Sequence, residues 1–312
     1  MLSRSAKGML LGLFATIVWG CQYSTNRFIF GTAVEELDPC LMTLMKILTG
    51  ALALIPFLFW DDGWRKAVRS LRQDFRMMSF MALFGIVGEG LLIFYAGKFI
   101  TAARSSLLAN MSPVFTVILA ALWTRKMPGW GKWLGMILGV AGLVLVLGTQ
   151  SADIYDCSGS TLPGDVMALT SGFCWAAYTV FGGETSRKYG GVPCTFVMLL
   201  LAAVMMFVVC LIIRSDFSLH LSWQAWGGIL FLGVVATGIS IAFWYIAIGM
   251  ADPSALGAYG YLSALISLVL ARVLARERFT WQFLAAFALI MIAIYFMNRP
   301  DAPEKAAKGT AV

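Results

Sequence analysis

Charged and metal-binding side chains are scarce in this sequence. Only 12% of the 312 residues are Asp, Glu, Lys or Arg, and His220 is the single histidine. The six cysteines show no CxxC pair and no spacing typical of metal ligands, and GxSxG, HExxH and Walker A patterns do not occur. We therefore expect no metal, no cofactor and no ATP-binding domain, and we do not expect an enzyme.

Long apolar runs dominate instead. Hydrophobic residues make up 60% of the chain, the mean hydropathy is +0.83, and the runs approach the ~20 residues that a helix needs to cross a bilayer. The pattern predicts an all-α polytopic membrane protein with ten transmembrane helices. The predicted spans are 8–30, 40–60, 76–97, 102–124, 131–149, 164–183, 194–213, 224–249, 254–275 and 279–297.

Lys and Arg are distributed unevenly over the connecting segments. With the N-terminus placed in the cytoplasm, most of them fall on cytoplasmic loops, so both termini and the short tail 299–312 are predicted inside. The net charge of +7 then reflects topology, and no nucleic-acid surface is expected. A signal peptide ending at Gly20-Cys21 is the less favoured alternative, because the apolar run continues to Phe30. We expect a multi-pass protein of the cell inner (cytoplasmic) membrane.

The chain repeats itself. Residues 101–126 align without gaps on residues 252–277, and Trp19 aligns with Trp175. This pattern divides the chain into a first five-helix repeat, 1–150, and a second one, 151–298. Because five is odd, the second copy must cross the membrane in the opposite sense, which predicts two inverted five-helix repeats. Inverted repeats are typical of transporters that work by alternating access.

Three stretches carry a resemblance to a known family. They are ATIVWG at 15–20, FYAGKFITAARSSLLANMSPVFTVILAAL at 94–122 and FWYIAIGMADPSALGAYGYLSALISLVLARVLARERFTW at 243–281. Together they resemble the drug/metabolite transporter superfamily, specifically its ten-helix EamA-type exporters. The chain departs from that pattern at Lys126, where the family commonly has an acidic residue, and at Ala264, where it often has proline. The resemblance implies a central cavity lined by helices 1, 3, 4, 6, 8 and 9, with helices 5 and 10 peripheral.

Polar and aromatic residues recur at helical spacing within the spans. Gly12, Ala15, Trp19, Gln22 and Asn26 are three or four residues apart and share one face of the first span. We interpret this face as the wall of a cavity, the alternative being helix packing with Gln and Asn as interhelical glue.

The second half offers an equivalent face. Ser171, Trp175, Tyr178 and Gly182 are the counterparts on the sixth span, and their tryptophan lies too deep for an interfacial belt. The remaining candidate substrate-binding residues are Asn110, Ser240, Trp244 and Tyr261.

Glu89 is the most informative single residue. A carboxylate near the bilayer centre costs ~2.5–3.5 kcal/mol on insertion scales, so it needs a partner or a function. It either binds the ammonium group of a substrate, or carries a coupling proton, or pairs with Lys46 or Arg104. Lys46 itself is expected to pack, to pair, or to extend toward the membrane surface, and Arg104 to anchor a helix end.

Cysteine and glycine patterns leave two further questions open. Cys40 and Cys157 are both predicted on the outer side, where a disulfide between the two halves is possible. Gly135 and Gly139 form a small-xxx-small motif, which allows a dimer, although packing within a monomer is the expectation.

The sequence therefore predicts a secondary active transporter for a small-molecule substrate, with the lipid bilayer as its other partner. Aromatic walls with one buried carboxylate favour an amino acid, an amine or a related zwitterion or cation. Export is the direction that the resemblance implies, and proton-coupled uptake is the alternative. A channel or receptor is less consistent with two symmetric halves around a polar pocket.

Overall fold

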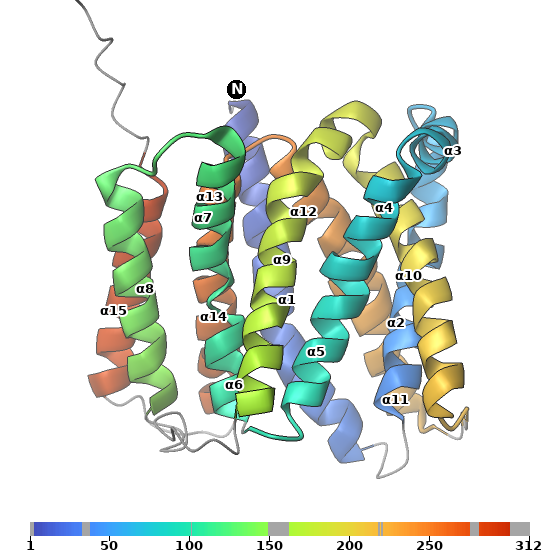
Figure 1. Ribbon diagram of the computed structural model, residues 1–312. Helices are drawn as coiled ribbons and strands as arrows, with labels where there is room; N and C mark the ends of the chain where they lie inside the picture. The colour runs from blue at the N-terminus through green and yellow to red at the C-terminus, as the bar shows by residue number, and fades with distance from the viewer. Residues whose placement is uncertain are drawn as a thin grey trace, which may run out of the picture.

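The structure is a computed structural model that describes residues 3–32, 38–100, 102–148, 162–217, 219, 221–274 and 281–299, and these contain helices and no strand. The helices of the first half are α1 (Arg4–Thr32), α2 (Pro39–Leu54), η1 (Ile55–Phe59), α3 (Gly63–Gln73), α4 (Phe75–Ala82), η2 (Leu83–Gly88), α5 (Glu89–Ala96), α6 (Ala102–Ala109), α7 (Ser112–Thr124) and α8 (Trp130–Gly148). Those of the second half are α9 (Leu162–Tyr189), α10 (Gly191–Ile213), α11 (Trp223–Leu230), η5 (Phe231–Ile239), α12 (Ser240–Ile248), α13 (Pro253–Gly257), α14 (Tyr259–Leu274) and α15 (Trp281–Met297). They stand side by side as a bundle (Figure 1).

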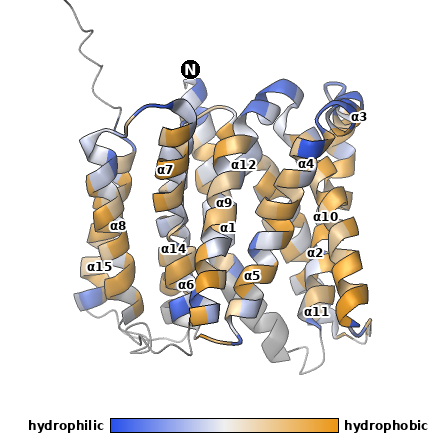
Figure 2. Cartoon of the chain, in the orientation of Figure 1, coloured by the Kyte–Doolittle hydropathy of each residue, from blue (hydrophilic) through white to orange (hydrophobic). Residues whose placement is uncertain are grey.

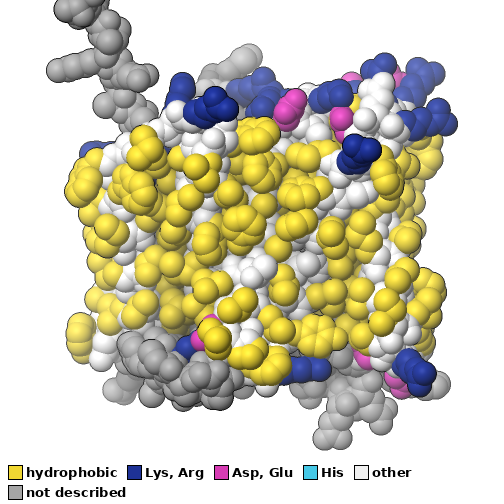
Figure 3. All heavy atoms as spheres, viewed as in Figure 1, with side chains coloured by type: hydrophobic (Ala, Val, Ile, Leu, Met, Phe, Trp, Pro, Cys, Tyr) yellow, Lys and Arg dark blue, Asp and Glu magenta, His cyan; other side chains and the backbone are white. Residues whose placement is uncertain are grey.

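The bundle has the surface of a membrane protein. Seven helical stretches of the described residues are long and apolar enough to cross a bilayer, and two shorter apolar helices, Trp130–Leu145 and Trp281–Met297, accompany them. Hydrophobic residues cover the helices between two polar ends (Figure 2), and Lys and Arg gather along the upper edge (Figure 3). The prediction of an all-helical polytopic membrane protein is confirmed. The predicted inverted repeats and the boundary at residue 150, which lies outside the described residues, stay predictions.

Helices α8 and α15 form a pair at one end of the bundle (Figure 1). Glycines allow the two to approach closely, since a Cβ added at Gly135 would lie 2.8 Å from the carbonyl oxygen of Ala293. The small-residue face of α8 is thus covered by a helix of the same chain. The monomer stays a prediction.

The interruptions of the helices follow the same order in both halves. The π-helical segment η2 interrupts α4 and α5, and η5 interrupts α11 and α12. The repeat aligns residues 101–126 on residues 252–277. The same offset aligns residues 83–88, which form η2, on residues 234–239, which lie within η5. Likewise, the fourth predicted span is broken between α6 and α7, and the ninth between α13 and α14. All four interruptions lie inside predicted spans, namely 76–97, 102–124, 224–249 and 254–275.

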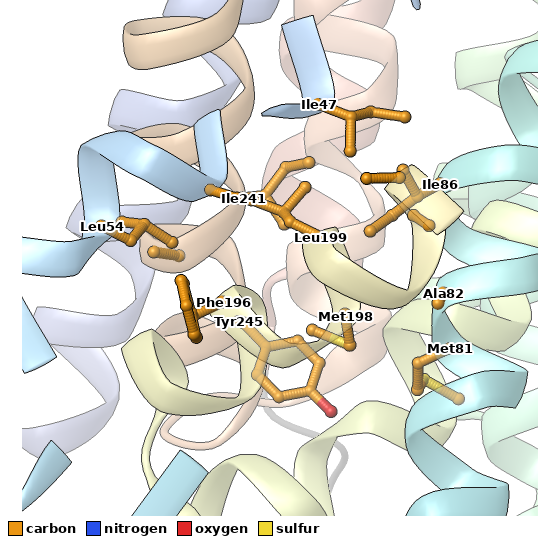
Figure 4. Close-up of a cluster of buried hydrophobic side chains, with 14 of the residues drawn as sticks. Ile47, Leu54, Met81, Ala82, Ile86, Phe196, Met198, Leu199, Ile241 and Tyr245 are labelled. Carbon is orange, nitrogen blue, oxygen red and sulfur yellow. The ribbon is translucent and has the colours of Figure 1, made fainter. Parts of the chain in front are cut away.

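A large apolar core fills the other end of the bundle, between α2, α4, α10 and α12. Figure 4 shows part of it, including Leu54, Phe196, Leu199 and Tyr245. Three isoleucines of the core, Ile47, Ile86 and Ile241, also line the cavity described below. The core therefore forms one wall of that cavity.

Candidate substrate cavity

A cavity of ≈ 170 Å³ lies between the two halves of the chain, and we call it the Trp-lined cavity. Drug-sized ligands usually occupy about 300–1,000 Å³, so this one suits a small solute. Its walls come from α1, α2, η2, α5, α7, α9, η5, α12 and α14 and from the junction of α6 and α7. No lining residue comes from α8 or α15, which agrees with the peripheral place that the family resemblance implied for them. That resemblance did not implicate the second span, which supplies Lys46 and Ile47.

Three tryptophans from three helices meet at the cavity. The ring of Trp19 lies 5.0 Å from that of Trp175, edge to face, and 5.2 Å from that of Trp244. The rings of Trp175 and Trp244 are 5.7 Å apart. Such contacts add about 0.5–1.5 kcal/mol each to the burial of the rings. The cluster therefore holds a rigid aromatic wall in place against the cavity.

A hydrogen bond fixes Trp19 to the second half. Its indole N–H donates to the carbonyl oxygen of Ala236 over 2.8 Å. Ala236 belongs to the π-helical segment η5, and π segments leave backbone carbonyls without their regular helical donor. The indole of Trp244 donates in turn to the hydroxyl of Thr179 at 3.3 Å. Both polar ring edges are thus satisfied. Trp244 is buried within the wall, whereas Trp19 and Trp175 are only partly buried.

Glu89 and Lys46 bring opposite charges to the same cavity. Glu89 is the first residue of α5, directly after η2, and Lys46 lies on α2. Each is within electrostatic range of the other, yet no hydrogen bond or ion pair joins their side chains in the described part of the chain. Because both charges lie within spans, neither can be solvated by bulk water outside the cavity. A ligand with complementary charges can satisfy both.

Arg104 does not take part in this arrangement. Its guanidinium binds both carboxylate oxygens of Asp165, with nitrogen to oxygen distances of 2.6 and 2.7 Å. This bidentate pair joins the start of α6 to the start of α9. Of the two structural partners weighed for Glu89, Arg104 is therefore occupied elsewhere.

The broken helix α6–α7 supplies a further polar wall. Asn110 lies at the break, just before Ser112 and Pro113 begin α7, and its amide donates to the carbonyl oxygen of Ser106 at 2.8 Å. Asn110 and Ser112 both line the cavity, and so do Tyr259 and Gly260 at the start of α14. At this break the backbone N–H groups of Asn110, Met111 and Val114 already donate to backbone carbonyls, so side chains supply its polar surface.

The structure brings together six of the ten candidate residues predicted from sequence. These six line the cavity: Trp19, Gln22, Glu89, Asn110, Trp175 and Trp244. The side chain of Asn26 lies outside the described residues. Whether any of the ten binds substrate stays a prediction.

The other three predicted residues lie behind the cavity wall. Tyr178 is fully buried, with its ring over Gly85 of η2, and Tyr261 is buried with its ring over Gly139 of α8. Ser240 is buried and donates its hydroxyl hydrogen to a backbone carbonyl of η5 over 2.8 Å. The two tyrosines contact neighbouring helices, which the sequence alone does not place.

Sequence reasoning did not select several residues that line the cavity. Lys46 was expected to pack, to pair or to reach the membrane surface, and the structure directs it into the cavity. The polar residues also missed are Thr16, Ser112, Thr237, Tyr259 and Ser263. Ser171, which was predicted to share a face with Trp175, does line the cavity. Thr237 could have been found, since it shares a helix face with Trp244.

Other candidate sites are weaker. A larger cavity of ≈ 600 Å³ carries Lys126, Glu184 and Arg187, but these charges lie at helix ends, where solvated charges are usual. Cys40 is buried and unpaired among the described residues, and Cys157 and His220 lie outside them. No group of three potential metal ligands assembles within the described part.

Comparison with known proteins agrees with the geometry. The EamA-like transporter family matches residues 6–148 and 162–299. An uncharacterized transporter of Archaeoglobus fulgidus is 27% identical over 270 residues, which cover 86% of this chain and 89% of that protein. The uncharacterized transporter YoaV of Bacillus subtilis is 21% identical over 238 residues, with coverages of 76% and 78%. A solved crystal structure has the same fold, with a TM-score of 0.80, 21% identity and coverage of 93% of this chain and 96% of that one.

Proposed function

Because the chain belongs to the EamA-like transporter family, we propose that it is a secondary transporter that moves a small organic metabolite through the Trp-lined cavity. The proposed architecture is ten transmembrane helices in two inverted repeats. It is supported by the matching positions of η2 and η5 and of the two helix breaks. It is also supported by the opposite directions of α1 and α9, which begin at opposite ends of the bundle in Figure 1.

The proposed mechanism is alternating access. Trp19 on α1 is hydrogen-bonded to η5, and its ring packs on Trp175 of α9, so contacts between the two halves hold this wall of the cavity together. Relative movement of the halves would loosen these contacts and expose the cavity to one side at a time. We place both termini in the cytoplasm of an inner-membrane protein, with the basic edge in Figure 3 facing inward.

The pair of opposite charges supports a specific substrate class. A zwitterion such as an amino acid can place its ammonium group at Glu89 and its carboxylate at Lys46. Its cationic group can at the same time lie over a tryptophan face, where cation–π attraction is ~0.5–2 kcal/mol. A simple amine would leave the ammonium of Lys46 unpaired in the cavity, which is unfavourable within a membrane. The single observation that carries the proposal is therefore that Lys46 and Glu89 face one cavity without a direct ion pair.

A flux experiment tests this function. Purified protein in liposomes should move labelled amino acids, while dicarboxylates should neither be transported nor raise the melting temperature. Glu89→Gln should abolish transport without loss of folding, and Glu184→Gln, a carboxylate in the other cavity, serves as the matched control. Normal flux and normal pH dependence in Glu89→Gln would contradict the role of this residue.

The same liposomes separate export from proton-coupled uptake. We propose export, which the family resemblance favours, with Glu89 as a binding group. If Glu89 instead carries a coupling proton, flux should follow an imposed pH gradient, and Glu89→Gln should permit exchange of substrate but no accumulation. Flux without any dependence on the pH gradient supports binding alone.

A further inference from the structure

Helix α3 presents three distinct faces, although the sequence around it was expected to form only a loop. It joins the second predicted span to the third and lies at the upper edge of the bundle (Figure 1). Gly63, Ala67 and Ser70 are buried, spaced four and three residues apart, and this face packs on α10. The contact fixes how the other two faces of α3 are oriented.

The next face along the helix is apolar and exposed. Trp64 is 53% exposed, Val68 37% and Leu71 38%, and Phe75 at the start of α4 continues the row with 52%. These residues are spaced like those of the buried face, but each lies one residue further along the chain. One residue corresponds to a rotation of about 100° around the helix, so the two rows form separate faces. An exposed apolar row beside the end of a membrane span is stable where it contacts lipid acyl chains.

The third face is basic. Arg65, Arg69, Arg72 and Arg76 repeat the same spacing, shifted by one more residue, and all four are exposed. Arg65 has only an exposed ion pair with Asp62 at 3.6 Å. No ion pair engages the other three arginines in the described part of the chain. Three guanidinium groups, two on α3 and one at the start of α4, are thus available.

The apolar and basic faces meet in a shallow hollow. Its lining residues are Trp64, Arg65, Val68, Arg69, Arg72 and Gln73. A phospholipid likewise joins apolar acyl chains to an anionic phosphate group. The guanidinium fork matches the geometry of a phosphate, because it donates two parallel hydrogen bonds.

We propose that α3 is a binding site for anionic phospholipids of the adjacent leaflet. The row from Trp64 to Phe75 contacts the acyl chains, and Arg69, Arg72 and Arg76 bind the phosphates. The site is tied to the transport core, because Asp74, directly after α3, accepts hydrogen bonds from Lys188 at 2.8 Å and from Tyr189 at 2.7 Å, both on α9. Lipid bound here therefore holds the segment that connects α2 with α4 against α9.

Native mass spectrometry of the purified full chain tests the proposal. The protein is titrated with phosphatidylglycerol and, separately, with phosphatidylcholine, which has no net charge. The wild type should prefer phosphatidylglycerol. Because each basic group near the surface contributes about fivefold, the triple variant Arg69→Gln/Arg72→Gln/Arg76→Gln should lose on the order of 100-fold in affinity for it.

Two further variants control for charge and for fold. Arg4→Gln/Lys7→Gln removes two charges from the start of α1 at the same edge (Figure 1) and should keep the preference for phosphatidylglycerol. Replacing the three arginines by lysine keeps the charge and should retain most of the affinity. Equal binding of the two lipids by the wild type would overturn the proposal. Undiminished phosphatidylglycerol binding by the triple glutamine variant, or displacement of the lipid by excess inorganic phosphate, would overturn it as well.

Discussion

Replacing Lys46 and Glu89 singly and together distinguishes a binding role from a structural one. The opposite charges of Lys46 and Glu89 attract each other, because each lies within electrostatic range of the other. Each single replacement removes this attraction and leaves one charge within the bilayer, where insertion costs ~2.5–3.5 kcal/mol. Lys46→Gln and Glu89→Gln should therefore both lower the melting temperature, whereas the double variant should melt at or above the wild-type temperature.

The transport assay then gives opposite results for the two roles. If the pair binds substrate, each charge-assisted hydrogen bond supplies ~1.5–3 kcal/mol, which corresponds to about 10- to 150-fold in affinity. Lys46→Gln should weaken zwitterion binding by that factor but strengthen binding of a simple amine, because the unpaired ammonium of Lys46 is then gone from the cavity. Glu89→Gln should weaken binding of both compounds.

The double variant decides between the roles. We expect it to fold and to bind zwitterions no better than the weaker single variant. Zwitterion transport at the wild-type rate by a stable double variant would refute the reasoning, because the two charges would then serve only each other. Isothermal titration in detergent and flux into liposomes provide the two measurements.

Three other predictions test the fold around the cavity. Trp19→Phe removes the hydrogen bond to η5 and should cost ~1–3 kcal/mol of stability, visible as a lower melting temperature. Gly50→Leu should abolish folding or transport, because a Cβ there would lie 2.8 Å from a backbone oxygen of η5, whereas Gly227→Leu, in open space, should be tolerated. Hydrogen bonds from Lys188 and the neighbouring tyrosine hold the pKa of Asp74 below its usual range. The stability from this contact should be present above the ordinary carboxyl pKa of about 3.9 and lost as the pH falls through the lowered value. In thermal melts, Asp74→Asn should lose that dependence.

That the chain is an all-helical, multi-pass membrane protein followed from its sequence. Hydrophobic runs of bilayer length report on transfer into lipid, which depends on composition more than on neighbours. The cost of placing a charge in lipid also marked Glu89 as a candidate functional residue, since an ionisable residue within a span needs a function or a partner. The spacing of Trp19 and Gln22 placed them on one face, because helical periodicity relates residues of one helix to each other.

Only the tertiary structure decided what each face contacts. Trp175 and Tyr178 are three residues apart, about 60° around α9, yet the first lines the cavity and the second lies against η2. Lys46 has a long flexible side chain that could reach several surroundings, and the helices around α2 determined that it faces the cavity. The two π-helical segments arise in the same way, since they depend on how neighbouring helices pack rather than on local preference. Sequence determined which residues the bilayer tolerates, and packing determined which of them meet, because contacts between helices depend on the rotation of each helix against all its neighbours.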